Sequence, residues 1–133
     1  MATKKALVIE KEEDILRICS ELLGKEGFKV VTAKSGMSAF EHLYQQSFDL
    51  VITSLVMEAG MGFTVLGMIR TLSPQTPLII FSDDEGSVVH HFLPFFGTCA
   101  FITKPCSGEL LVSCIKDPLI NGNNGSAHTL EAL

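Results

Sequence analysis

Leu50-Val51-Ile52-Thr53 decides the fold class, because this short run is apolar nearly throughout and does not alternate with polar residues. A strand with one face in water alternates, whereas a strand buried on both faces, as in a parallel sheet, stays apolar along its length. Four runs of similar length and composition accompany it. The five lie at Ala6–Ile9, Phe28–Thr32, Leu50–Thr53, Leu78–Phe81 and Ala100–Thr103. The sequence therefore predicts five buried, parallel strands.

Helical patterns separate the runs, with apolar residues recurring at the spacing of one helix face. These positions are Ile15, Ile18, Cys19, Leu22 and Leu23; Ala39, Phe40 and Leu43; Val65, Leu66, Ile69 and Leu72; Val88, Val89, Phe92 and Leu93; and Leu110, Leu111, Cys114 and Ile115. The fourth pattern is the weakest, since Gly86 and Pro94 disfavour a helix. The order is (βα)5. It predicts an α/β fold of three layers, with helices on both faces of the sheet.

Helix ends are marked by residues suited to caps. Gly24 and Gly27 stand where the first helix should stop. Ser35 or Ser38 is the candidate N-cap of the second, and Ser73-Pro74 ends the third. These marks leave short connections between the predicted elements, as a compact α/β domain requires.

Length and charge limit the possible functions. A chain of 133 residues with 47% hydrophobic residues fits one domain; we expect it to span residues 4–117, with 118–133 as a flexible tail or linker. The net charge of −5 argues against direct nucleic-acid binding. No apolar stretch approaches the ~18 residues of a membrane span, and the start does not resemble a signal peptide. We therefore expect a cytoplasmic protein without membrane contact.

The four cysteines show neither CxxC nor a metal-ligand spacing. Buried thiols are the simplest interpretation of so sparse a set. A redox sensor using Cys99, Cys106 or Cys114 remains an alternative from another functional class.

Polar residues follow the predicted strands, at the edge where open parallel sheets bind ligands. The segments at this edge are Glu10-Lys11-Glu12-Glu13, Ser54–Glu58, Ser82–Glu85 and Lys104-Pro105. The acidic segment after the first strand would repel a phosphate, which argues against the rival hypothesis of a small enzyme or flavin carrier.

Four longer stretches, which span the strand ends and the residues after them, resemble bacterial response-regulator receiver domains of two-component systems. The similar stretches are Leu7–Ile15, Asp49–Phe63, Leu78–Ser82 and Phe101–Pro105. The resemblance extends from Lys5 to Asp117. It implies a flavodoxin-like fold with strand order 2-1-3-4-5, and a role in phosphorelay signal transduction rather than catalysis.

The resemblance also implies a phosphorylation pocket, which is only partly present. Ser82 fits the hydroxyl expected after the fourth strand, and Lys104 fits the lysine expected after the fifth. Ser54 stands where the family has its phosphoacceptor aspartate. Lys11, after Glu10, breaks the acidic pair that would hold Mg²⁺. The chain is therefore predicted to be a pseudo-receiver that accepts no phosphoryl group by the family route.

The altered pocket suggests a different set of charge pairs. We expect Mg²⁺ binding to be lost, because Ser54 and Lys11 replace two of the likely carboxylate ligands and Lys11 adds a cation. Lys11 would stand in for the metal, pairing with Glu10 or Asp83. Lys104 would pair with Glu10 or Glu58. The alternative is that Glu58 and Asp83 are solvated loop charges.

Signalling would then proceed by protein contact. In the family, the fourth helix, fifth strand and fifth helix form the usual partner surface. Here it would include Phe92, Phe95 and Phe101, and Phe101 stands at the aromatic switch position. The alternative is that a kink at Pro94 places the rings of the Phe92–Phe96 run in the core. Sensor kinases or downstream effectors are the expected partners, with a homodimer through the same face as an alternative. A second alternative keeps the receiver but switches it through modification of Ser54 or a small ligand in the pocket.

Overall fold

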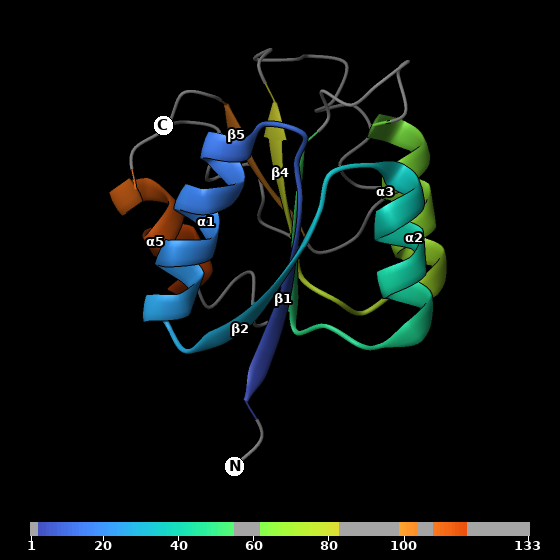
Figure 1. Cartoon of the computed structure of the whole chain (residues 1–133), viewed down its shortest axis with the longest axis horizontal. Helices are drawn as coiled ribbons and strands as arrows, with labels where there is room; N and C mark the ends of the chain where they lie inside the picture. Colours follow the sequence, from blue (N-terminus) through green and yellow to red (C-terminus); the bar gives the residue numbers. More distant parts are fainter. Residues whose placement is uncertain (1–2, 55–61, 83–98, 104–107, 117–133) are drawn as a thin grey trace.

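Strands and helices alternate along the chain, as predicted (Figure 1). The computed structural model describes residues 3–54, 62–82, 99–103 and 108–116. The strands are β1 (Lys4–Ile9), β2 (Phe28–Ala33), β3 (Leu50–Ser54), β4 (Leu78–Ser82) and β5 (Cys99–Thr103). The described helices are α1 (Glu13–Lys25), α2 (Gly36–Gln45), α3 (Gly62–Leu72) and α5 (Gly108–Lys116). Each predicted strand is confirmed to within two residues at either end.

The strands form one parallel sheet in the order β2-β1-β3-β4-β5. This is the order that the family resemblance implied. Helices α1 and α5 cover one face of the sheet, and α2 and α3 cover the other (Figure 1). The prediction of a flavodoxin-like, three-layer α/β fold is confirmed.

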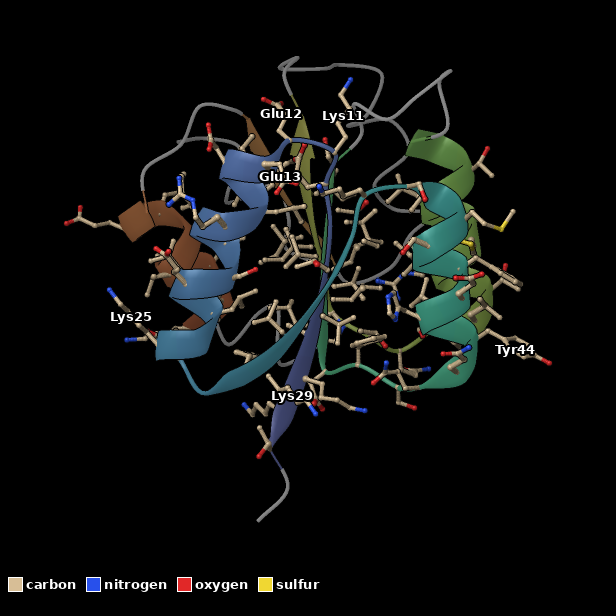
Figure 2. The ribbon with its side chains drawn as sticks, viewed as in Figure 1. Lys11, Glu12, Glu13, Lys25, Lys29 and Tyr44 are labelled. Carbon is tan, nitrogen blue, oxygen red and sulfur yellow. The ribbon has the colours of Figure 1, made fainter. Side chains whose placement is uncertain are left out.

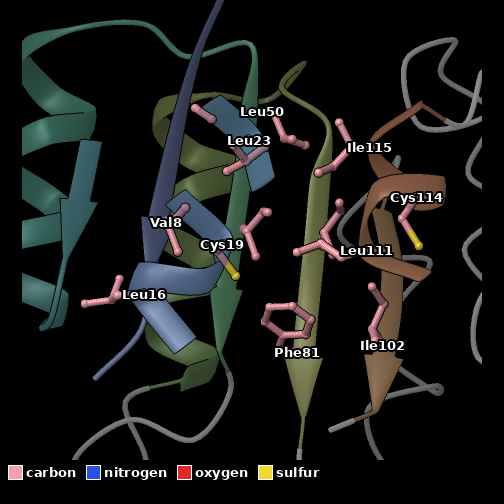
Figure 3. Close-up of a cluster of buried hydrophobic side chains, with 13 residues drawn as sticks. Val8, Leu16, Cys19, Leu23, Leu50, Phe81, Ile102, Leu111, Cys114 and Ile115 are labelled. Atoms are coloured by element: carbon pink, nitrogen blue, oxygen red, sulfur yellow. The ribbon is translucent and has the colours of Figure 1, made fainter. Parts of the chain in front are cut away.

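Each face of the sheet has its own hydrophobic core, because successive strand residues point to opposite faces. In β1, Leu7 and Ile9 join the core beneath α2 and α3. Ala6 and Val8 join the core beneath α1 and α5, which Figure 3 shows. All four side chains are at most 1% exposed. Burial on both sides explains why the strand sequences are apolar without alternation.

Local signals explain where two helices begin or end. The Ser35 hydroxyl accepts a hydrogen bond from the Ser38 N–H at 3.1 Å, so Ser35 is the N-cap of α2 and the other candidate lies inside the helix. Gly27 has a φ of 95° just after α1, a conformation that glycine adopts without strain. Both helix boundaries follow from the sequence.

Two residues assigned to buried helix faces are exposed instead. Ile18 is 45% exposed and Phe40 is 42% exposed. The inner face of α1 is formed by Leu16, Cys19 and Leu23. Apolar spacing identified the helices correctly, but it overestimated how much of each apolar face is covered.

Several predicted features lie outside the described residues. They include the fourth helix, Phe92 and Phe95, the whole of 83–98, and the segment 118–133. Among the described helices, the longest has 13 residues, and none is long and apolar enough to cross a membrane.

Candidate functional site

The carboxyl ends of the strands bring the predicted pocket residues to one edge of the sheet. Ile9 pairs with Thr53 across β1 and β3, so the next residues, Glu10 and Ser54, follow side by side. Ser54 pairs in turn with Phe81 of β4. The register therefore places a carboxylate and a hydroxyl in adjacent positions, where the sequence located the pocket.

Glu10 is a buried carboxylate held by backbone groups. It is 1% exposed, and its Oε2 accepts a hydrogen bond from the Glu12 N–H at 3.2 Å. Its own N–H donates to the Ala33 carbonyl at 2.9 Å, which extends the pairing of β1 with β2. A buried charge is costly unless it is paired and hydrogen-bonded, so these contacts give Glu10 a fixed position at the edge.

Ser54 is the last residue of β3 and its exposed fraction is 0%. Its carbonyl oxygen accepts a long hydrogen bond of 3.4 Å from the Thr53 hydroxyl. Another enzyme must reach a hydroxyl before it can modify it. In this conformation the Ser54 side chain is not accessible to solvent.

Lys11 lies in the turn after β1 and is exposed. Figure 2 shows its side chain projecting outward at the end of the sheet. Within the part of the chain that the structure describes, it forms no ion pair with Glu10. Asp83, its other proposed partner, lies outside the described residues. The structure therefore does not show the Lys11–Glu10 ion pair by which Lys11 was expected to stand in for the metal.

An ion pair at the same edge was missed by the sequence analysis. The Lys34 ammonium contacts the Glu13 carboxylate, joining the connection after β2 to the start of α1. Ile9 pairs with Ala33 across β1 and β2, so the residues that follow these strands are neighbours. The strand order, once known, would have predicted this contact.

The remaining pocket and surface residues are only partly described. Ser82 and Phe101 lie in the backbones of β4 and β5, but their side chains are outside the description. Lys104, Glu58, Phe92 and Phe95 lie outside the described residues altogether.

Metal ligands are sparse in the described part of the edge. No group of three or more histidine, cysteine, aspartate or glutamate side chains suited to a metal occurs in the described ranges. Glu12 is exposed and Glu13 pairs with Lys34, which leaves Glu10 as the buried carboxylate of the described edge. A magnesium site usually adds a second carboxylate or a phosphate to such a group. The described edge therefore contributes one buried carboxylate toward such a site.

Two of the four cysteines can be placed. Cys19 and Cys114 are free thiols in the core beneath α1 and α5, and they are at most 1% exposed (Figure 3). Reactive cysteines are partly accessible and lie in electropositive surroundings, so these two thiols are typical of structural residues. The side chains of Cys99 and Cys106 are outside the description.

Known proteins share this chain's sequence pattern. Residues 6–116 match the family described as Response regulator receiver domain. The chain is 31% identical over 114 residues to the transcriptional regulatory protein GlrR of Escherichia coli (strain K12), covering 85% of this chain and 26% of GlrR. It is 28% identical over 114 residues to protein PilG of Pseudomonas aeruginosa, covering 84% of each. The chain thus spans about a quarter of the length of GlrR.

A solved structure shares the fold. The crystal structure of a response regulator receiver domain protein (CheY-like) from Methanospirillum hungatei JF-1 superposes with a TM-score of 0.81. The match covers 89% of this chain and 94% of that one, at 22% sequence identity. The superposition agrees with the sheet order and layer arrangement described above.

Proposed function

Since the chain belongs to the family of response regulator receiver domains, we propose that it is a pseudo-receiver that signals by protein contact, without aspartyl phosphorylation. The observation that carries this proposal is Ser54. It ends β3 beside Glu10, fully buried, where the family resemblance places the phosphoacceptor. A serine hydroxyl is a weak nucleophile at its ordinary pKa and cannot form an acyl phosphate, so we infer that this position accepts no phosphoryl group by the family route.

Loss of Mg²⁺ binding is the second part of the proposal. Lys11 occupies the place of an acidic ligand, and its cation at the mouth of the pocket opposes a divalent ion. Its exposure weakens this repulsion by solvent screening, so the missing carboxylate at Ser54 contributes more to the loss than the added lysine does.

The buried charge of Glu10 requires compensation in such a pocket. Its Oε2 accepts the Glu12 N–H, and a carboxylate that is 1% exposed is stabilised further by a positive charge nearby. We propose Lys104 as its ionic partner, since the family places this lysine next to the phosphoacceptor. The ion pair would hold the domain in one signalling state without a phosphoryl group.

The readout would use the face formed by the fourth helix, β5 and α5, with Phe92, Phe95 and Phe101 as its aromatic residues. A sensor kinase or a downstream effector is the proposed partner, and a homodimer through this face is the alternative. A cytoplasmic location fits both kinds of partner.

Intact mass spectrometry tests the central claim. The native chain is incubated with Mg²⁺ and a small acyl-phosphate donor, beside the double variant Lys11→Asp/Ser54→Asp. We expect no added phosphoryl mass on the native chain and a gain on the double variant. A phosphorylated native chain would refute the proposal, and peptide mapping would then locate the acceptor.

A further inference from the structure

The outer face of α2 carries a row of exposed apolar side chains. Met37, Phe40 and Tyr44 are 70%, 42% and 74% exposed, and their i, i+3, i+7 spacing places them on one face over about 10 Å of helix. We call these three residues the α2 stripe. Figure 2 shows Tyr44 pointing from α2 away from the sheet. Apolar side chains gathered on one surface in this way are typical of a contact site.

The two rings of the α2 stripe are already arranged. Phe40 and Tyr44 stack with their centroids 6.0 Å apart and an interplanar angle of 22°. The inner face of the same helix, Ala39 and Leu43, is buried in the core, which fixes the helix that presents the rings. A preorganised aromatic surface loses little conformational entropy when a partner binds.

An anionic group lies among these apolar residues. Glu41 is exposed, follows Phe40 in sequence and lies one turn before Tyr44, so it shares the outer face of α2. No ion pair of Glu41 occurs within the described ranges. The face thus combines aromatic rings with an available carboxylate.

Cations close to α2 are engaged elsewhere. Lys34, just before the helix, pairs with Glu13. Arg70 of α3 donates to the carbonyls of Ser73 and Pro74 at 3.0 and 3.2 Å. Neither side chain neutralises Glu41, so a partner can supply the missing positive charge.

We propose that the α2 stripe docks a positively charged amphipathic helix of another protein, through an arginine that stacks on Phe40 and Tyr44 and pairs with Glu41. A guanidinium is planar, stacks on aromatic faces and hydrogen-bonds to carboxylates. The chain's net charge of −5 also favours a basic partner during diffusional encounter. Helix α2 covers the opposite face of the sheet from α5, the described helix of the readout surface proposed above (Figure 1).

A second copy of this chain fits the stripe poorly. In an antiparallel pair of α2 helices, Met37 would lie opposite Tyr44, so the twofold axis would pass between Phe40 and Glu41. Glu41 would then lie opposite Phe40 of the second copy, and the two Glu41 carboxylates would both lie next to the axis, where like charges in close proximity disfavour an interface. Three side chains of at most about 250 Å² each also fall short of the ~800 Å² per partner of a standard interface.

Tyr44 provides a direct measurement, because it is the one tyrosine of a chain without tryptophan. The probe is a capped alanine-based helical peptide with leucine and arginine along one face. The matched peptide carries glutamate in place of arginine. We expect the arginine peptide to change Tyr44 fluorescence and the amide NMR peaks of residues 36–45, with a Kd between about 10 μM and 1 mM for so small a contact.

Substitutions of Phe40 and Glu41 measure how much each side chain contributes to binding of the arginine peptide. Phe40→Ala should weaken binding at least about tenfold, as expected for an aromatic anchor. Glu41→Gln should weaken it about threefold, and added salt should reduce that difference. Ile18→Ala is the matched control, since Ile18 is 45% exposed on α1 and its removal should leave Kd unchanged.

Four outcomes of the peptide experiment would overturn the proposal. They are no binding of the arginine peptide up to millimolar concentration, equal binding of the glutamate peptide, NMR changes centred on α1 or α5, and an unchanged Kd in both α2 variants. Self-association of the free protein that broadens the peaks of residues 36–45 would favour the homodimer instead, and would also overturn it.

Discussion

Glu10 and Ser54 lie side by side at the carboxyl edge of the sheet, because Ile9 pairs with Thr53 across β1 and β3. Both residues are buried, with exposed fractions of 1% and 0%. A carboxylate beside a neutral hydroxyl needs less compensating charge than two neighbouring carboxylates do. The native pair is therefore suited to a pocket that functions without a divalent cation.

Ser54→Asp should destabilise the domain at neutral pH. The new carboxylate is placed in a buried position beside Glu10, so we expect a loss of about 2–4 kcal/mol in the free energy of unfolding. Urea denaturation measures it, with Ser54→Asn as a neutral control of nearly the same size. Equal stability of both variants at pH 7 would contradict a buried carboxylate pair.

Replacing the Glu10 carboxylate tests its proposed pairing with Lys104. Glu10→Gln and Lys104→Met should each lower the free energy of unfolding, because each leaves its partner charge uncompensated. The double variant should cost less than the sum, with an interaction energy of at least about 1 kcal/mol. Chemical denaturation of the native protein, the two single variants and the double variant measures this double-mutant cycle. Additive effects would show that Lys104 does not contact Glu10.

The strands were predictable because burial on both faces leaves a clear mark in sequence. Every residue of Leu50–Ser54 is buried, and the run is correspondingly apolar. The start of β1 was not predictable in this way. Lys4 is exposed and pairs with Phe28 through its backbone, and backbone pairing is independent of side-chain polarity.

The candidate site was located more reliably than its contacts. The predicted ends of the first and third strands identified Glu10 and Ser54, because residues at the carboxyl ends of parallel strands lie at the edge of the sheet where ligands bind. The direction of Lys11 depends on the dihedral angles of the turn, which the sequence does not determine. The pair of Lys34 with Glu13 requires knowledge that β2 lies beside β1, which the residues alone did not establish.

Alanine substitutions of a buried and an exposed isoleucine should differ in how much they lower the free energy of unfolding. Ile52→Ala removes a side chain that is 0% exposed in the core beneath α1 and α5, and should cost about 2–5 kcal/mol. Ile18→Ala removes the same atoms from a side chain that is 45% exposed, and should cost less than about 1 kcal/mol. Thermal or urea unfolding measures both. A similar loss in the two variants would mean that Ile18 is covered in solution, by a partner copy or by another part of the chain.

Two glycines near the end of α1 should respond to alanine in opposite directions. Gly27 has a φ of 95°, where a Cβ is strained although no atom crowds it within 4 Å, so Gly27→Ala should cost about 1 kcal/mol. Gly24 lies in the last turn of the helix, and a Cβ there also meets nothing within 4 Å. Gly24→Ala should therefore stabilise by about 0.5–1 kcal/mol, through higher helix propensity and a less flexible unfolded chain. Urea denaturation of the two variants decides between this account and a purely steric one, which predicts no change in either because both sites have open space.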